Sequence, residues 1–161
     1  MKLYNKVAFS IVAIAFTACQ SNNEPQPINY GKDQCDHCQM TITDNKYGAE
    51  LITSKGRVYK FDDITCLEGY NEEHSDKTKD SKHYVSDFES HELIPVEKAT
   101  FIYGGELKSP MGGNRAAFLD KTKATEFAEK LGASSEPQQS STEEHHHDEG
   151  GEENPHSMHN H

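Results

Sequence analysis

The 161-residue sequence is poor in positive charge, contains a single long apolar run and lacks any recognisable catalytic motif. Its 16 Lys and Arg residues face 27 Asp and Glu residues, which argues against nucleic acid as a partner. The apolar run at residues 7–16 is too short to span a bilayer as a stable helix, and no second run suggests another membrane crossing. No nucleophile elbow, phosphate loop or suitably spaced pair of acids is present, so we do not expect an enzyme.

Residues 1–18 are organised like a bacterial lipoprotein signal. Lys2 and Lys6 precede the apolar run, and two small residues come directly before Cys19. This pattern predicts that Cys19 becomes the lipidated first residue of the mature chain; an ordinary secretory signal is the alternative. We therefore expect an extracytoplasmic protein on the periplasmic side, anchored to a membrane by lipid. The polar, proline-containing residues 19–30 are predicted to form a flexible tether.

Residues 134–161 form an acidic, histidine-rich tail without Lys or Arg. Apolar residues are nearly absent, so the segment cannot offset the entropy lost on ordering, and we expect it to be disordered. Its histidines are interspersed with Asp, Glu, Asn and Pro, which favours a native metal-loading tail over an expression tag. The predicted weak, auxiliary metal ligands are His145, His146, His147, His156, Met158, His159 and His161.

Residues 31–133 remain as one small domain. Alternating apolar and polar residues, a turn at Lys55-Gly56 and a helix cap at Asp62 or Asp63 predict two strands followed by a helix. The same order then repeats, which indicates an α+β domain built from two similar halves. The predicted strands are residues 47–54, 57–61, 83–88, 98–104 and 115–120, and the second predicted helix spans residues 121–132.

Two of the four cysteines lie close together in "QCDHCQMTITD", residues 34–44. The β-branched residues 41–43 favour a strand, and if residues 38–42 are extended, the side chains of Cys38 and Met40 point to one face. A thiolate beside a thioether forms a soft pair that selects Cu(I) over harder divalent ions. The sequence therefore predicts a Cu(I) site with Cys38 and Met40 as ligands.

Two further sulfur-bearing residues, Cys66 and Met111, are candidate ligands. Cys66 falls in the first turn of the helix that begins after "FDD", where the helix N-terminus is expected to stabilise a thiolate and lower its pKa. Met111 lies in the polar loop "SPMGGN" with almost no apolar neighbours in sequence. Met111 is therefore either a metal ligand or, as most methionines are, a residue of the hydrophobic core.

Three other uses of the cysteines remain open. A redox-active Cys35-x-x-Cys38 motif needs a helix after it, whereas "QMTITD" favours a strand. A structural zinc site needs four ligands, which could be Cys35, His37, Cys38 and Cys66, although no second cysteine pair exists. A disulfide is plausible in an oxidising compartment, with Cys35 and Cys66 as the expected pair and Cys38 left free.

The stretch "CDHCQMTITDNKYGAELITSKGRVYKFDDITCLEGY" (residues 35–70), together with "SPMGGNRAAF" (residues 109–118), resembles the NosL family, the copper-binding accessory lipoproteins of nitrous oxide reductase assembly. The lipoprotein-like signal agrees with this resemblance. It implies a Cu(I) chaperone outside the cytoplasmic membrane, with an α+β fold of two ββαβ-like halves. It also implies that copper passes towards nitrous oxide reductase with the help of a membrane transporter complex.

Residue by residue, the resemblance makes Cys38 and Met40 the characteristic ligand pair and Met111 a later ligand. Cys35 and Cys66 match positions at which members of the family vary more, so the resemblance implies a ligand role for them less directly. A general extracytoplasmic protein that sequesters copper or zinc is the alternative function. A thiol oxidoreductase acting through Cys35 and Cys38 is a third hypothesis.

Overall fold

The structure is a computed structural model and describes residues 24–135. The predicted signal peptide, the predicted lipidation site Cys19 and the tail ligands at residues 145–161 lie outside these residues. Within residues 24–135, no helix is both long and apolar enough to cross a membrane.

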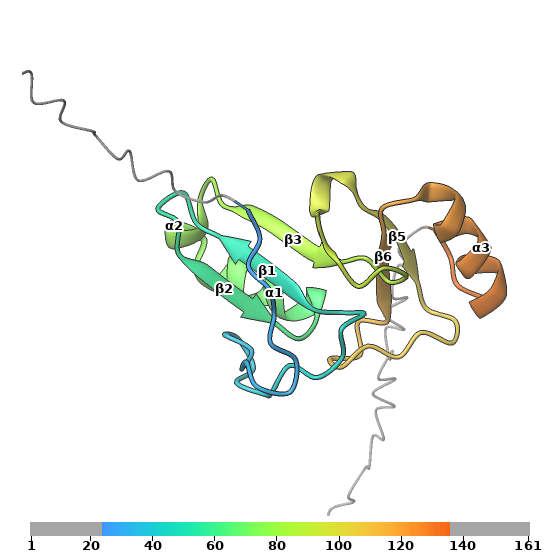
Figure 1. Cartoon of the computed structure of the whole chain (residues 1–161), viewed down its shortest axis with the longest axis horizontal. Coiled ribbons are helices and arrows are strands. Elements are labelled where there is room, and N and C mark those ends of the chain that lie inside the picture. Colours follow the sequence, from blue (N-terminus) through green and yellow to red (C-terminus); the bar gives the residue numbers. More distant parts are fainter. Residues whose placement is uncertain (1–23, 136–161) are drawn as a thin grey trace, which may run out of the picture.

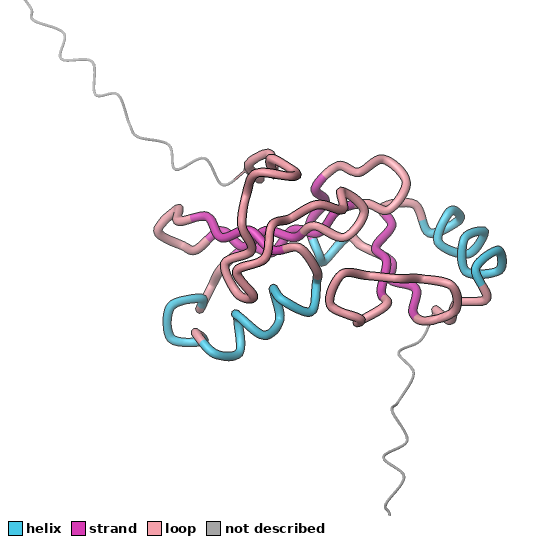
Figure 2. The backbone as a smooth tube through the Cα atoms, turned by 90° about the horizontal axis from the view of Figure 1, so that it is seen from below, coloured by secondary structure: helices cyan, strands magenta, loops and turns pink. Residues whose placement is uncertain are grey.

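The first half of the domain is a four-stranded antiparallel sheet in the order β2-β1-β3-β4. Two helices follow β2 and lie on one side of this sheet, while loop segments cover the other side (Figure 2). The elements are β1 (Ala49–Ile52), β2 (Val58–Phe61), α1 (Ile64–Glu73), α2 (Ser75–Thr78), β3 (Lys82–Ser86) and β4 (Leu93–Pro95).

The second half is smaller and lies at the other end of the molecule (Figure 1). A short 3-10 helix, η1 (Val96–Lys98), leads into the antiparallel pair β5 (Thr100–Tyr103) and β6 (Arg115–Phe118), which is followed by α3 (Lys121–Leu131). The predicted α+β fold of two similar halves is confirmed. Within the described residues the second half ends as ββα, and there the chain after α3 returns to β5 through one bridge between Tyr103 and Ser134.

Local sequence signals account for most of these elements. The turn at Lys55-Gly56 joins β1 to β2, and Gly56 supplies the positive φ of 79° that this turn requires. Of the two candidate caps, Asp63 is the N-cap of α1, and its side chain accepts a hydrogen bond from Thr65 N. Asp120 caps α3 in the same way, and Gly132 ends α3 in the left-handed conformation. The predicted strand at residues 41–43 is not formed.

Each half has its own hydrophobic core. The first core lies between the sheet and α1 and includes Leu51, Phe61, Leu67 and Val85. The second lies between the β5-β6 pair and α3 and includes Tyr47, Ile102, Leu107, Ala116, Phe118, Ala124 and Ala128. Because the second core includes Tyr47 from the first half of the sequence, the two halves are packed together rather than strung on a linker.

The segment directly before the cysteine loop packs on the domain. Ile28 is buried, and Gln26 N donates a hydrogen bond of 2.9 Å to the buried Glu50 side chain of β1. Figure 1 shows this segment crossing in front of β1. The predicted tether at residues 19–30 is therefore wrong from residue 26 onward, because a backbone hydrogen bond of Gln26 and the buried side chain of Ile28 fix the segment to the domain.

Candidate metal centre

Four potential metal ligands from three parts of the fold meet at one end of the first sheet. The Sγ atoms of Cys35, Cys38 and Cys66 and a carboxylate oxygen of Asp62 all lie within 4.8 Å of one another. Cys35 and Cys38 come from a loop, Asp62 follows the last residue of β2, and Cys66 is the third residue of α1. This group is referred to below as the cysteine cluster.

The loop that supplies two of these thiols closes on itself. Cys35 N donates to the carbonyl of Met40 at 2.8 Å, and Gln39 N donates to the carbonyl of Cys35 at 3.0 Å. A single bridge between Gln34 and Thr41 completes the closure. Gln39 has a φ of +64°, so the chain turns between Cys38 and Met40. The condition that residues 38–42 are extended is therefore not met, and the side chains of Cys38 and Met40 do not share one face of a strand.

Contacts with β2 hold the cysteine loop in place. Asp36 N donates to the Lys60 carbonyl at 2.8 Å, and the Asp36 carboxylate accepts from Lys60 N at 2.7 Å. The Lys60 ammonium group in turn donates to Asp33 Oδ2 and to the carbonyl of Pro27, both at 2.7 Å. The backbone N–H and the carbonyl of Lys60 therefore both form hydrogen bonds with Asp36 of the loop. These bonds fix the loop next to the end of β2 and hence next to Asp62.

The histidine between the two cysteines lies against α1. A Cβ atom built on Gly69 is only 2.9 Å from His37 Nε2, and His37 Nδ1 is 3.6 Å from Glu73 Oε2. Among the described residues, the metal-ligand group contains Asp62 where the zinc hypothesis placed His37. The set of four ligands proposed for structural zinc is therefore wrong in its fourth member.

Burial dominates the ionisation of the two inner thiols. Burial raises the pKa of Cys35 to about 11, although backbone hydrogen bonds from Cys38, Asp62 and His37 act in the opposite direction. Burial also raises the pKa of Cys66, and its contacts with Asp62 and Cys35 raise it further. The expectation that the pKa of Cys66 is lowered at the helix N-terminus is wrong, because burial and the contacts with Asp62 and Cys35 all raise it.

Two of the competing hypotheses lose support at this point. All three cysteines in the described part of the chain are free thiols, so the expected Cys35–Cys66 disulfide is not formed. A redox-active dithiol of the thioredoxin kind requires a lowered thiol pKa, whereas the pKa of Cys35 is raised. The cluster instead suits an ion that displaces the thiol protons as it binds.

Comparison with known proteins agrees with this geometry. The sequence model of the NosL family matches residues 27–137, which is most of the chain. The chain belongs to the NosL family. The crystal structure of the copper chaperone NosL from Shewanella denitrificans has the same fold, with a TM-score of 0.58 and 24% sequence identity, over 68% of this chain and 89% of that chain. No curated protein matches the chain significantly.

In this NosL protein, both predicted methionine ligands lie at the surface. Met40 is 53% exposed and Met111 is 39% exposed. Met111 N donates to Asp63 Oδ2 at 3.0 Å, and Gly113 lies directly against Thr65 Oγ1. The loop between β5 and β6 therefore sits on the first turn of α1, beside the cysteine cluster. The ligand roles of Met40 and Met111 stay predictions.

Sequence reasoning missed Asp62 as a member of the cluster. Asp62 is 2% exposed and accepts a contact of 3.5 Å from Cys38 Sγ, whereas Asp63 alone caps α1. The doubled aspartate in "FDD" was the available signal, because one carboxylate suffices for the cap and leaves the other for a different role.

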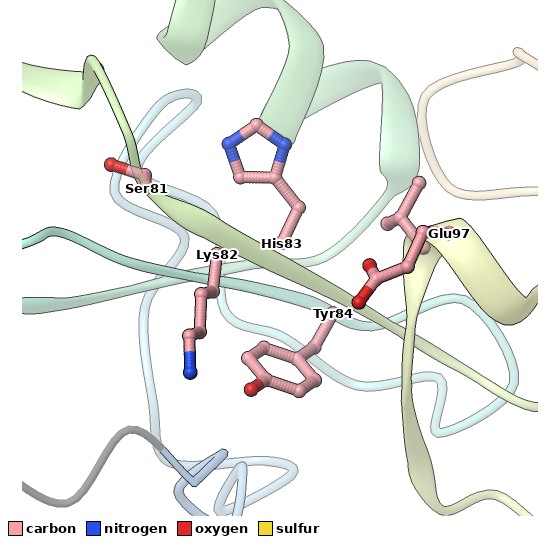
Figure 3. A pocket seen from close by; sticks show the side chains of 6 residues that line it. Ser81, Lys82, His83, Tyr84 and Glu97 are labelled. Atoms are coloured by element: carbon pink, nitrogen blue, oxygen red, sulfur yellow. The ribbon is translucent and has the colours of Figure 1, made fainter.

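A pocket beside β3 contains no group of metal ligands comparable to the cysteine cluster. It is lined by residues 81–84 together with Val96 and Glu97, and His83 points towards the helices while Lys82 and Tyr84 point to the other face of the strand (Figure 3). Burial lowers the pKa of His83, and Glu97 opposes this shift. Within residues 24–135, only the cysteine cluster gathers three or more His, Cys, Asp or Glu ligands closely enough to hold an ion.

Proposed function

We propose that this NosL protein is an extracytoplasmic copper chaperone, not an enzyme, that carries Cu(I) for the copper centres of nitrous oxide reductase. The observation that carries the proposal is the convergence of three thiols and one carboxylate within 4.8 Å. Thiolate sulfur is a soft ligand and selects Cu(I) over harder ions. Membership of the NosL family and the shared fold with a protein named as a copper chaperone support the same function.

The position of the cluster also suits the transfer of an ion to a partner. Cys38 is half-buried, and the exposed Met40 follows it after one residue. An ion bound to Cys38 can therefore be reached from outside the molecule. We propose nitrous oxide reductase, or the membrane transporter complex that matures its copper centres, as the recipient. Lipidation at Cys19 would hold the chaperone at the membrane where these recipients work.

Anaerobic titration of the full chain with Cu(I) and with Zn(II), each against a competing chelator, tests the choice of metal. We expect one tight Cu(I) ion per chain and weaker Zn(II) binding. Tight Zn(II) binding without a preference for Cu(I) would contradict the copper proposal, because it would show that the cluster acts as an ordinary tetrahedral zinc site.

Sequestration of copper or zinc is the second candidate function, and the carboxylate in the cluster favours it. Three thiolates and one carboxylate also form a closed four-ligand set of the kind that holds zinc without releasing it. Delivery and sequestration differ in what happens to the ion. Incubation of the Cu(I)-loaded chain with copper-free nitrous oxide reductase should transfer copper if the chain is a chaperone and should leave the copper in place if it only sequesters metal.

A further inference from the structure

A group of exposed cations gathers where β1 turns into β2. This surface, called the basic end below, consists of Lys55, Arg57, Lys77, Lys79 and Lys82. The first four line one pocket between the turn and α2, together with Asp76 and Asp80. Lys82 pairs with Ile52, the last residue of β1. The basic end therefore carries more cations than acids, although the chain has a formal net charge of −11.

The cations of the basic end form no ion pair within residues 24–135. Elsewhere, Lys60, Arg115 and Lys123 each lie within 3.1 Å of a carboxylate oxygen. Arg57 instead lies over the ring of Tyr59, with 4.9 Å between its guanidinium carbon and the ring centroid. The charges of the basic end are therefore not paired with a neighbouring carboxylate and can interact with an external anion.

The N-terminal segment runs towards the basic end. The Ile28 side chain packs against Gly48, and Gln26 N donates to Glu50 at 2.9 Å. Going back along this segment from residue 28 to residue 26 therefore advances along β1 from residue 48 to residue 50, in the direction of the β1–β2 turn. Figure 1 shows the described chain beginning at this end of the sheet. Glu24, the first described residue, is an exposed acid there.

The predicted lipidation site is close in sequence to this point. Cys19 lies five residues before Glu24. Five residues reach at most about 17 Å when fully extended, which is less than the roughly 30 Å diameter of a small domain. A lipid on Cys19 therefore favours orientations in which the basic end is the part of the domain nearest to the membrane.

The cysteine cluster lies at the opposite end of the same two strands. Ala49, the first residue of β1, pairs with Phe61, and Asp62 of the cluster follows Phe61 directly. The five-residue step from Arg57 to Asp62 corresponds to roughly 16 Å along a strand. A membrane at the basic end therefore leaves the cluster on the far side of the first sheet from the bilayer.

We propose that the basic end docks on the anionic headgroups of the membrane, so that the cysteine cluster faces away from the bilayer. The proposal rests on the proposed lipid anchor at Cys19 and does not depend on which metal the cluster holds. Each Lys or Arg near an anionic surface strengthens binding by roughly a factor of five. The exposed acids of α1, which are Glu68, Glu72 and Glu73, repel the same surface and so disfavour the other orientations.

This orientation identifies the kind of partner that can reach the ion. The ion is exchanged with a protein domain that stands clear of the bilayer, because the cluster faces the aqueous side. The attraction between the basic end and the headgroups is electrostatic, so it weakens as salt screens the charges.

Acetylation of lysines on the lipidated full chain in vesicles tests the docking. Lys82 reports on the basic end, and the exposed Lys130 of α3 serves as the reference. In vesicles of phosphatidylcholine mixed with phosphatidylglycerol, Lys82 should react roughly tenfold more slowly, relative to Lys130, than in vesicles of phosphatidylcholine alone. High salt should abolish the difference.

Two triple charge reversals with the same change in net charge provide the matched comparison. The test variant is Lys55→Glu/Lys77→Glu/Lys79→Glu, which keeps Lys82 as the reporter. The control variant is Lys98→Glu/Lys108→Glu/Lys121→Glu, which changes three exposed lysines outside the basic end. The test variant should lose the slow reaction of Lys82, and the control variant should keep it.

Four results would overturn the docking. They are equal reaction of Lys82 in both kinds of vesicle, loss of the slow reaction in both triple variants, the same slowing by inorganic phosphate in phosphatidylcholine vesicles, and absence of lipid on the mature chain by mass spectrometry. The third would identify a small-anion pocket instead. Failure of the chain to bind Cu(I) in the chelator titration would overturn the copper function and leave the docking intact.

Discussion

Cys38 is the one cysteine of the cluster that solvent can reach, and it is common to every ligand set considered for copper. Its thiol donates to the Asp62 carboxylate at a long 3.5 Å, and the hydroxyl of a serine can donate to the same buried acceptor, so the replacement leaves that acceptor with a partner. We expect Cys38→Ser to abolish tight Cu(I) binding and to leave the free energy of unfolding of the metal-free chain almost unchanged. Chelator competition and urea denaturation of the same protein sample measure the two effects.

The same substitution links binding to function in cells. A strain with Cys38→Ser should fail to reduce nitrous oxide at limiting copper and should recover when copper is supplied in excess. Full nitrous oxide reduction by this strain at limiting copper would contradict the chaperone proposal, whatever the binding measurements showed.

Gly69 is the second residue whose replacement tests the centre, because its lack of a side chain lets His37 lie against α1. An alanine Cβ would lie 2.9 Å from His37 Nε2, so Gly69→Ala should push the ring away and shift the cysteine loop. We expect the Cu(I) affinity to fall by about tenfold, within the range seen when supporting groups of metal sites are changed. Alanine otherwise favours a helix over glycine by about 1 kcal/mol, so stability should not fall in parallel.

The control for Gly69→Ala is Glu73→Gln. This substitution removes the charge that faces His37 Nδ1 at 3.6 Å and adds no atom near the ring. A fall in affinity with Glu73→Gln and none with Gly69→Ala would show that charge, not the position of the ring, supports the loop.

At the scale of elements, local signals predicted most strands and helices but not β4 or α2, and contacts between distant segments decided the site. The β1-β2 turn, the caps of α1 and α3 and the end of α3 at Gly132 depend on neighbouring residues and were predictable. The cysteine loop is not a strand, because its closure depends on Lys60 and on the positive φ of Gln39. Lys60 is distant in sequence from the cysteine loop, so a local pattern does not reveal its contacts. No residue propensity predicts a positive φ at Gln39.

The pKa of Cys66 shows the same limit at the site. The rule that a helix N-terminus lowers a thiol pKa uses only sequence-local information. The opposite shift comes from burial beside Cys35 and Asp62, which lie on other segments. The sequence therefore pointed to the three cysteines as possible ligands of one metal site. The presence of Asp62 in the cluster and the raised pKa values of the thiols became apparent only from the fold.

Asp87 joins the first sheet to the second. It follows β3 and pairs with Ala117 of β6 through an isolated parallel bridge, and its side chain is 6% exposed. One carboxylate oxygen accepts from Leu119 N at 2.7 Å and the other from Ser90 N at 2.8 Å. Burial alone would raise the pKa of Asp87, but these backbone hydrogen bonds outweigh it and lower the pKa below the ordinary value of 3.8.

Asp87→Ala should lower the free energy of unfolding at pH 7 by about 2–3 kcal/mol, since two charge-assisted hydrogen bonds are lost. The folded-state pKa is lowered, so the carboxylate contributes its stability above the unfolded pKa of about 4 and loses it as the pH falls through the folded value. The difference between the variant and the unchanged chain in urea denaturation should therefore shrink between pH 5 and pH 3. The exposed neighbour Glu89, changed to Gln, should show no comparable difference at either pH.

At the scale of the whole molecule, both halves of the domain meet at the candidate metal centre. The first half supplies the cysteine cluster, and the second half supplies the loop with Met111, which docks on the N-terminus of α1 through Asp63. The Asp87 junction keeps the halves together and so keeps this loop at the rim of the cluster. The recipient protein would approach the same rim, because Met40 and Met111 are its exposed sulfur-bearing residues.

We expect the histidines at residues 145–161 to add a second class of metal ligand to the chain. Imidazole is a neutral donor with a pKa of about 6.5, so it binds metal more weakly than a cluster of thiolates and loses metal as it protonates. We expect several weak copper or nickel ions per chain, which vanish when residues 136–161 are removed. These ions should also dissociate between about pH 7 and pH 5.

The truncated chain decides whether the two classes of ligand are independent. Truncation retains every residue of the cysteine cluster as well as Met40 and Met111, so the tight Cu(I) ion should remain with unchanged affinity. Equilibrium dialysis of both chains at pH 7 and pH 5 counts the weak ions, and chelator competition measures the tight one. If truncation removes the tight ion together with the weak ones, copper is held by the tail histidines, and the cysteine cluster is not the copper site.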